Sequence, residues 1–342
     1  MITLDRVSAQ RGGFTLTEVS LQVPEGAYAV VIGPAGSGKT TLLDVIAGLA
    51  PIADGRLTLA GRETRGMPPE RRDVGMVYQH DFLFPHLSVR ENVAYGTDNH
   101  RQSEALAERF GVTALFARTV RGLSGSERQL VALTRALACR PRILLLDEPF
   151  SALDPRRRTL VRREVRALHR EWGLTTVQVT HDFSEAGLLG DVAILLDQGR
   201  VLQVGPPADV FRRPASPYVA EFLGAENVFA GTVRRVDAEL ADAGPTTSAA
   251  QQAMVFDTGT LTFFAVGDFA AGAGHAVIRA EEVTVARDQT HDSARNRFAG
   301  RVTEVATVGA LTRVTVDVRG TPIIAAVSTQ SASDLALAPG LA

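Results

Sequence analysis

Short continuous apolar runs recur through residues 1–224 of the chain, separated by longer stretches with helical spacing. Runs of this length and β-branched content are typical of strands that are buried on both faces of a sheet. The clearest are Tyr28–Ile32, Ile143–Leu146, Thr175–Val179 and Val192–Leu196. Because strands alternate with helices, the pattern predicts an α/β domain with a mostly parallel sheet over residues 1–224.

Two helical stretches lie between these runs. Pro155–Trp172 follows Asp154, whose carboxylate can accept hydrogen bonds from the first free backbone N–H groups, and proline is well suited to the first helical position. Thr40–Leu49 follows a glycine-rich segment. Both stretches are predicted to be helices.

The pattern changes after Gly224. The remaining residues are rich in Val, Thr, Ala and Gly and contain short alternating segments such as Arg313–Val318. Alternation with period two indicates strands with one buried face. Residues 225–342 are therefore expected to form small β-barrel or sandwich structure, which we class as a small all-β, OB-like domain.

An internal repeat lies within this second part. Asn227–Val236 and Asn296–Val305 share six of ten residues at an offset of 69. We interpret them as two related copies of one β-module, at about 226–286 and 292–342. The stretch Asp237–Gln252, rich in Ala, Asp, Thr and Ser, is expected to be a surface excursion in the first copy.

Composition narrows the class of protein. The 36 basic and 38 acidic residues nearly balance, which gives no support to nucleic-acid binding. The single cysteine, Cys139, cannot form an internal disulfide, as expected in a reducing cytosol. No apolar run approaches the ~20 residues of a membrane span, and Met1–Arg11 lacks the pattern of a secretory signal. If the protein works at a membrane, other chains are expected to span it.

A phosphate-binding loop follows the first predicted strand. The segment GPAGSGKTT satisfies G-x-x-x-x-G-K-[ST] and opens a helix, which is the context that this motif needs. Backbone N–H groups would converge on the phosphates, Lys39 would reach the β- and γ-phosphates, and the Thr40 hydroxyl would bind Mg²⁺. Lys39 is the only lysine of the chain. The residues assigned to the nucleotide are Gly33, Pro34, Ala35, Gly36, Ser37, Gly38, Lys39, Thr40 and Thr41.

Two carboxylates end the apolar run of Ile143–Pro149. Asp147 is placed to hold Mg²⁺, directly or through water. Glu148 is placed to polarise the attacking water as general base. An acidic pair after a strand is weak evidence alone, but with the phosphate loop it predicts an ATPase.

Four further segments narrow the family. Leu123–Glu127 (LSGSE), followed by a predicted helix, resembles the signature motif of ABC ATPases. Gln79 resembles their Q-loop glutamine, Ser151–Asp154 (SALD) their D-loop, and His181 their switch histidine. With the phosphate loop and the acidic strand end, they occur in the family's order and spacing over residues 1–224.

The resemblance implies a mechanism. Two subunits would close head to tail around two ATP molecules, each held between the phosphate loop of one subunit and the signature motif of the other. His181 would contact the γ-phosphate, and Gln79 would bind Mg²⁺, sense the γ-phosphate and signal to a membrane-spanning permease. The signature and D-loop residues assigned to the nucleotide are Ser124, Gly125, Ser126 and Asp154.

This chain departs from the family pattern at two points. Ser126 stands where the signature usually has a second glycine, so a Cβ lies where backbone approaches phosphate, and turnover is expected to be reduced rather than abolished. The aromatic residue that stacks on adenine in the family is not obvious; Phe14 is the candidate, and it could equally be a core residue.

The order of an ATPase followed by a small β-domain resembles importers that use a separate solute-binding protein. The segments SARN, FAGRV, GALTRV and SASDL resemble the molybdate-binding module of molybdate and tungstate importers. Small hydroxyls, backbone N–H groups and one arginine suit a tetrahedral dianion. The alternative is a module that binds nothing and only dimerises. The possible oxyanion ligands are Ser293, Ala294, Arg295, Asn296 and Ser331.

The resemblance implies a homodimer at the cytoplasmic face of the membrane, with permease subunits and a periplasmic or extracellular binding protein as partners, and ATP and Mg²⁺ as cofactors. An importer ATPase for ferric ion, sulfate or a polyamine is the main alternative. A non-transport ABC ATPase would carry long coiled-coil insertions, zinc cysteines or two cassettes, and the sequence has none of these. A molybdate-responsive regulator would need a DNA-reading helix, and the phosphate loop argues against it.

Overall fold

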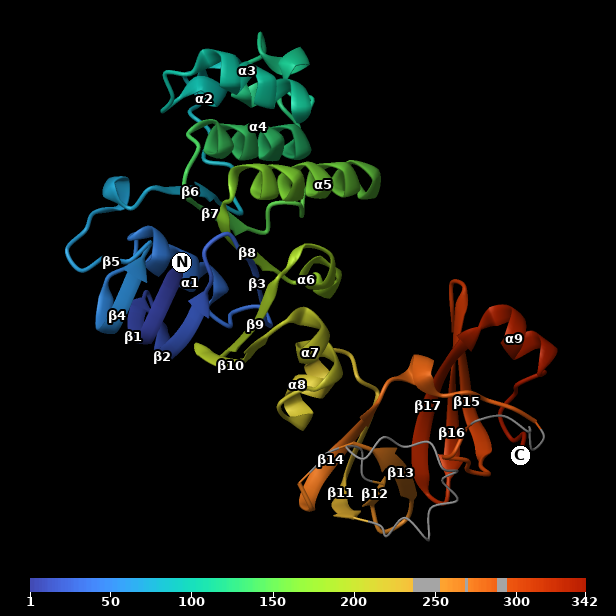
Figure 1. Ribbon diagram of the computed structural model, residues 1–342. Coiled ribbons are helices and arrows are strands. Elements are labelled where there is room, and N and C mark those ends of the chain that lie inside the picture. The colour runs from blue at the N-terminus through green and yellow to red at the C-terminus, as the bar shows by residue number, and fades with distance from the viewer. Residues whose placement is uncertain (236–252, 268–269, 288–293) are drawn as a thin grey trace. The chain divides into compact units, whose positions relative to one another are not determined.

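The computed structural model describes residues 1–235, 253–267, 270–287 and 294–342 (Figure 1). The chain divides into two compact units, Met1–Arg213 and Pro214–Ala342. The expected boundary at residue 224 lies after helix α8 (Pro217–Phe222), whereas this division places α8 in the second unit, where it packs against strands β11 and β14.

A six-stranded sheet in the order β10-β9-β3-β8-β7-β6 forms the centre of the first unit. Its strands are β3 (Tyr28–Ile32), β6 (Val74–Val77), β7 (Ile143–Asp147), β8 (Thr175–Thr180), β9 (Val192–Asp197) and β10 (Arg200–Gly205). All neighbouring pairs are parallel except β9 and β10. Every residue of β3, β7 and β8 is buried, as continuous apolar runs require. The predicted mostly parallel sheet is confirmed.

A second, antiparallel sheet in the order β2-β1-β4-β5 belongs to the same unit. Its strands are β1 (Ile2–Arg11), β2 (Phe14–Val23), β4 (Ile52–Leu59) and β5 (Arg62–Glu63). Helix α1 (Lys39–Ala47) buries Leu42 and Ile46 in a core that also contains side chains of both sheets. This packing fixes the start of α1, which carries the phosphate loop, against the central sheet.

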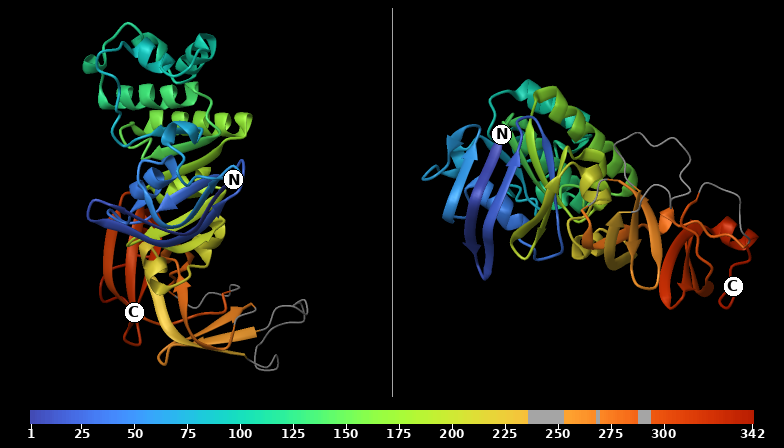
Figure 2. Two further views of the ribbon diagram at one scale, coloured as in Figure 1. Left: turned by 90° about the vertical axis from the view of Figure 1, so that its left-hand side faces the viewer. Right: turned by 60° about the horizontal axis from the view of Figure 1, so that its bottom comes forward.

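The helices of the first unit do not all pack on the central sheet. Figures 1 and 2 show α2, α3 and α4 stacked at one end of this unit. In addition to α1, the unit contains the helices α2 (Val89–Ala94), α3 (His100–Arg109), α4 (Gly125–Ala138), α5 (Pro155–Trp172), α6 (Phe183–Leu189) and α7 (Pro207–Arg212). Short 3₁₀ turns occupy Pro69–Arg71, Thr113–Leu115 and Val120–Gly122. Within the described ranges, no helix is both long and apolar enough to cross a membrane.

The helix ends follow their capping residues. Helix α5 begins and ends as predicted, and the Asp154 carboxylate accepts hydrogen bonds from the N–H groups of Arg156 and Arg157, both at 3.0 Å. Helix α1 ends at Ala47 rather than Leu49, because Gly48 adopts a left-handed conformation with φ of 89° and its N–H group closes the last turn.

The second unit is all-β apart from short helices, as predicted. One antiparallel sheet has the order β13-β12-β11-β14 and another the order β15-β16-β17. The strands are β11 (Asn227–Arg235), β12 (Ala253–Asp257), β13 (Thr262–Val266), β14 (Gly272–Ile278), β15 (Arg301–Val308), β16 (Leu311–Val318) and β17 (Thr321–Ser328). Its described residues also include α8, a 3₁₀ turn at Ala280–Glu282 and helix α9 (Thr329–Asp334). The excursion expected at Asp237–Gln252 lies outside the described residues.

The two sheets of this unit share one core, to which Phe229 and Phe263 of the first sheet and Ile323 of the second contribute. The asparagine that begins each repeat bonds to the backbone of a strand elsewhere in this unit. Asn227 Nδ2 donates to Ile324 O at 2.8 Å, and its Oδ1 accepts from Ile324 N at 2.7 Å. Asn296 makes the same pair of bonds to Phe264, at 2.9 and 2.7 Å. The repeated asparagines therefore act as reciprocal clamps.

We expect Asn227→Ala to destabilise the second unit more than Asn296→Ala. Asn227 is 2% exposed, so its loss leaves partly buried backbone groups of Ile324 in β17 unpaired, at a cost of about 1–3 kcal/mol. Asn296 is exposed, and water can replace its amide. Hydrogen exchange of the full chain should show faster exchange of the Ile324 amide in Asn227→Ala. Equal protection in both variants would contradict the clamp at Asn227.

Candidate nucleotide site

Three parallel strands bring the predicted catalytic segments together. Strand β3 runs into the phosphate loop, β7 ends at Asp147, and β8 ends directly before His181. The register aligns Ile32 with Thr180 and Asp147 with Val179. The carboxyl ends of these strands therefore meet at one edge of the sheet, where open α/β sheets usually bind ligands.

The phosphate loop is closed around its lysine. Lys39 Nζ donates to the carbonyl oxygens of Gly33 and Pro34, both at 2.8 Å. Burial lowers the pKa of Lys39, while the nearby carboxylates of Glu148 and Asp147 oppose that shift. Gly38, at the N-cap of α1, has φ of 100°, which a residue with a Cβ rarely adopts. The loop has the donors that phosphates require, and the buried Ser37 hydroxyl has no partner among the described residues.

Oxygen ligands suited to Mg²⁺ lie beside the loop. Thr40 Oγ1 donates to Asp147 Oδ2 at 2.8 Å. Burial raises the pKa of Asp147, and the hydrogen bond from Thr40 opposes this shift. Hard oxygen donors fit the preference of Mg²⁺, and a bound cation would favour the charged carboxylate. Gln79, the third predicted ligand, is exposed just beyond the end of β6.

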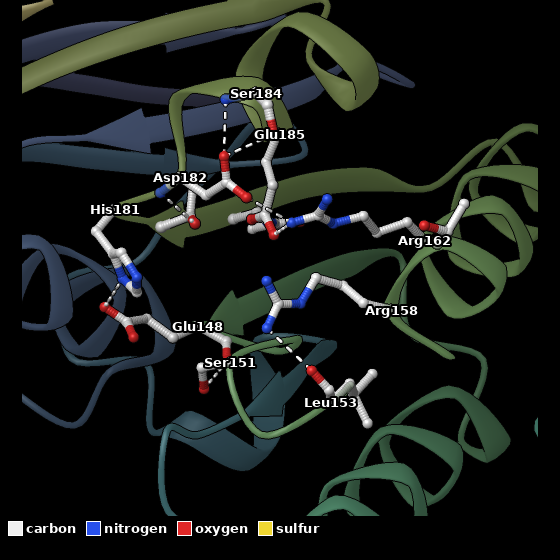
Figure 3. A network of polar contacts seen from close by, with 12 residues as sticks. Glu148, Ser151, Leu153, Arg158, Arg162, His181, Asp182, Ser184 and Glu185 are labelled. Atoms are coloured by element: carbon white, nitrogen blue, oxygen red, sulfur yellow. Dashed lines mark hydrogen bonds and ion pairs between the residues drawn. The ribbon is translucent and has the colours of Figure 1, made fainter. Parts of the chain in front are cut away.

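The predicted base and the predicted switch histidine are in contact. His181 Nδ1 lies 3.1 Å from Glu148 Oε1, as Figure 3 shows. The backbone of Glu148 has φ of 47°, and its N–H group donates to Val179 O at 3.0 Å. Such left-handed backbone at a non-glycine residue costs about 1–3 kcal/mol and clusters at functional sites. The side chain of His181 is 70% exposed, so it is free to meet a substrate.

The signature motif forms the start of helix α4, which begins at Gly125, within the motif, rather than after it as expected. Ser124 is the N-cap, and Glu127 completes a capping box: Ser124 Oγ accepts from Glu127 N at 3.3 Å, and Glu127 Oε2 accepts from Ser124 N at 2.7 Å. The Ser126 hydroxyl lies 3.2 Å from that of Ser124. In Figure 1 α4 lies in the helical layer, away from the phosphate loop at α1.

The segment after Gln79 is tied to this helix. Arg128 Nε, in α4, forms an ion pair with Asp81 Oδ2 at 2.6 Å. Arg135, also in α4, donates to the carbonyl oxygen of Phe82 at 3.1 Å. These contacts link Gln79 to the signature helix, and no motif in the sequence pointed to them.

The candidate for adenine stacking lies beside the loop. A Cβ built on Gly38 would come within 2.4 Å of the Phe14 ring, so the ring packs directly on the loop backbone. Phe14 also packs against the core of the unit. Both alternatives for Phe14 are thus compatible with its position. Asp154, predicted to touch nucleotide, caps α5.

The possible oxyanion ligands are only partly brought together. Ser293 lies outside the described residues, and Ala294 and Arg295 are exposed. The Asn296 amide is engaged by the backbone of Phe264. The Ser331 hydroxyl lies 2.7 Å from that of Ser328, the N-cap of α9. The side chains of Asn296 and Ser331 thus already have partners within the unit.

Comparisons with known proteins agree with this geometry. Residues 16–151 match the family model "ABC transporter", and residues 292–342 match "TOBE domain". The molybdate/tungstate import ATP-binding protein WtpC of Pyrococcus horikoshii is 34% identical over 99% of this chain and 95% of its own length. The sulfate/thiosulfate import ATP-binding protein CysA 2 of Chromobacterium violaceum is 39% identical over 91% of this chain and 82% of its own.

The solved structures lead to the same family. One similar structure is that of the ATP-binding cassette MJ0796, in a dimeric post-hydrolysis state with ADP and Pi. It is 28% identical to this chain, and the match covers 60% of this chain and 99% of the MJ0796 chain, with a TM-score of 0.56. The expected ABC ATPase fold with an added β-domain is thereby confirmed. The chain belongs to the ATP-binding subunits of ABC transporters, which are ATPases.

Proposed function

We propose that the chain hydrolyses ATP with Glu148 as general base and His181 as its partner at the γ-phosphate. The observation that carries this proposal is the meeting of both side chains with Lys39 and Asp147 at the carboxyl ends of β3, β7 and β8. Glu148 Oε1 is held by His181, which leaves the second carboxylate oxygen to accept a proton from the attacking water.

The phosphate loop binds and orients the triphosphate in this proposal. Lys39 exchanges its carbonyl partners for the β- and γ-phosphate oxygens, and the N–H groups at the start of α1 face the same anion. Thr40 and Asp147, with Gln79, would hold Mg²⁺, which supplies charge neutralisation at the phosphates. The chain's own contribution is the placement of Glu148 opposite the phosphate that these groups fix.

Two copies of the chain complete each site in this proposal. Ser124, Gly125 and Ser126 lie at the N-terminus of the 14-residue helix α4, where free N–H groups and the helix dipole favour an anion. Because they lie away from the phosphate loop of the same chain, they are available to a second copy. The dimeric state of the similar cassette MJ0796 supports this arrangement.

The transport step follows from the family. The dimer, peripheral at the cytoplasmic face of the membrane, would move a permease between two facing states, with a separate solute-binding protein delivering the cargo. We propose molybdate or tungstate as that cargo, supported by the similarity to WtpC along almost the whole chain. The exposed Arg295 and the backbone N–H groups near it are the groups proposed to bind the same anion in the β-domain.

Sulfate is the second candidate cargo. The observation that favours it is the higher identity, 39% against 34%, to the sulfate/thiosulfate protein of C. violaceum. Molybdate, tungstate and sulfate are tetrahedral dianions, so similar donors recognise all three.

Uptake by cells separates the two candidates. Cells that lack this chain should lose uptake of radiolabelled molybdate and retain uptake of radiolabelled sulfate. The wild-type chain should restore molybdate uptake, and the Glu148→Gln variant should not, which ties the loss to hydrolysis. Loss of sulfate uptake alone would contradict the molybdate proposal and support the sulfate one.

A further inference from the structure

Three arginines on one face of α5 attach this helix to three neighbouring segments of the chain. Arg158, Arg162 and Arg166 are spaced by four residues, which places them on one side of a helix. Arg158 Nη2 donates to the carbonyl oxygen of Leu153, in the D-loop, at 2.9 Å. Arg166 pairs with Asp191, before β9. Arg162, which lies between them on this face, points toward Asp182 and Glu185.

Arg162 contacts the two segments that carry the Glu148–His181 pair. Its Nη2 donates to Asp182 Oδ2 at 2.8 Å, and Asp182 directly follows His181. Its guanidinium lies 5.7 Å from the ring centroid of Phe150, two residues after Glu148. Figure 3 shows Arg158 and Arg162 reaching from α5 toward these segments. One guanidinium thus touches a neighbour of the base and a neighbour of the histidine.

The partners of Arg162 are themselves fixed. Asp182 Oδ1 accepts from the Ser184 backbone at 2.9 Å and from its hydroxyl at 2.6 Å, which caps α6. Glu185, 3% exposed, pairs with Arg162 and accepts a hydrogen bond from Gln178. Gln178 in turn accepts from the hydroxyl of Tyr28, at the start of β3. The network therefore ties α5 and α6 to the strand that leads into the phosphate loop.

We propose that Arg162 is a positioning residue for hydrolysis, which holds His181 against Glu148 by fixing Asp182 and Phe150. This inference rests on the proposed roles of Glu148 and His181. Arg162 touches neither of them, and Lys39 is held by other groups, the carbonyl oxygens of Gly33 and Pro34. Its loss should therefore slow the chemical step and leave nucleotide binding unchanged.

Steady-state kinetics of the full chain test this proposal. Arg162→Gln should lower kcat for ATP about tenfold and change KM by less than about twofold. In a His181→Ala background, Arg162→Gln should have almost no further effect, because residues that act through one another are not additive. Arg162→Lys should recover most of the rate, because a single cationic nitrogen, Nη2, makes both ion-pair contacts.

Arg166→Gln is the matched control. It removes an arginine of similar burial from the same helix face, 16% exposed against 13%, but its partner Asp191 lies outside the two catalytic segments. Its kcat should stay within about twofold of wild type. Because Arg162→Gln leaves the buried Glu185 without its cationic partner, Arg162→Gln/Glu185→Gln serves if the single variant fails to fold.

Two results would overturn the inference. One is that the losses from Arg162→Gln and His181→Ala multiply, which would make them independent. The other is that Arg166→Gln lowers kcat as much as Arg162→Gln, which would make the effect a general loss of stability. Wild-type turnover in His181→Ala and Glu148→Gln would instead reject the proposed site itself, so the two failures are distinguishable.

Discussion

Glu148→Gln should bind ATP as tightly as the wild-type chain and hydrolyse it at least 100-fold more slowly, on the order of the usual contribution of a general base. In the wild-type chain, His181 Nδ1 lies 3.1 Å from Glu148 Oε1. The amide of the variant keeps the shape of the side chain and can still pair with His181. It cannot accept the proton of the attacking water. The measurement is kcat under saturating ATP, together with the dissociation constant for ATP.

Glu171→Gln is the control for this substitution. Glu171 is an exposed carboxylate near the end of α5 and pairs with Arg109. It precedes the first residue of β8, whereas the proposed site lies at the carboxyl ends of the strands. Its loss should leave kcat unchanged. Turnover near wild type in Glu148→Gln would remove Glu148 from the role of base.

Lys39→Ala should weaken ATP binding itself, by roughly 10- to 100-fold, as expected for a lost hydrogen-bonded charge. The Nζ group is the cation at the loop, and burial already lowers its pKa, so it is poised to gain from an anionic partner. Titration calorimetry with ATP gives the affinity, and thermal unfolding shows whether the variant is folded.

Lys39→Arg separates charge from shape. A planar guanidinium does not fit where a compact ammonium contacts two loop carbonyl oxygens, so this variant should also bind ATP poorly. Unchanged ATP affinity in Lys39→Ala would contradict the phosphate-loop assignment.

The parts of the fold that local patterns specify were predictable. Strand β3 has the predicted bounds because all its residues are buried, which forces a continuous apolar run. Helix α5 begins at the predicted residue because Asp154 caps it and Pro155 occupies its first position. Strand β1 gave no such signal: a bulge between Leu4 and Val7 shifts the alternation, so the period-two pattern breaks.

The candidate site was predictable where motifs lie at strand ends. Glu148 and His181 follow the neighbouring strands β7 and β8, so their contact follows from the parallel sheet. Arg162 was not predictable, because seven arginines lie between residues 156 and 170 and spacing alone does not show which face meets Asp182. Helix α4 starts earlier than expected because Ser124 and Glu127 form a capping box, which places the first turn inside the signature motif.

The Asn227 and Asn296 clamps show a further limit of sequence reasoning. The repeat indicated related β-strands, and both asparagines are its first residue. Their partners, Ile324 and Phe264, lie 97 and 32 residues away, so the pairing depends on how the sheets pack.

Closure of two copies around ATP is tested most directly through the chain's single cysteine. Cys139 is exposed at the end of α4, the helix that begins with the signature motif. A spin label at Cys139 in the Glu148→Gln background reports the distance between the two α4 helices of a dimer by pulsed electron resonance. If the two copies close around ATP, the distance distribution is shorter and narrower with Mg²⁺ and ATP than with ADP. The same distribution with both nucleotides would contradict it.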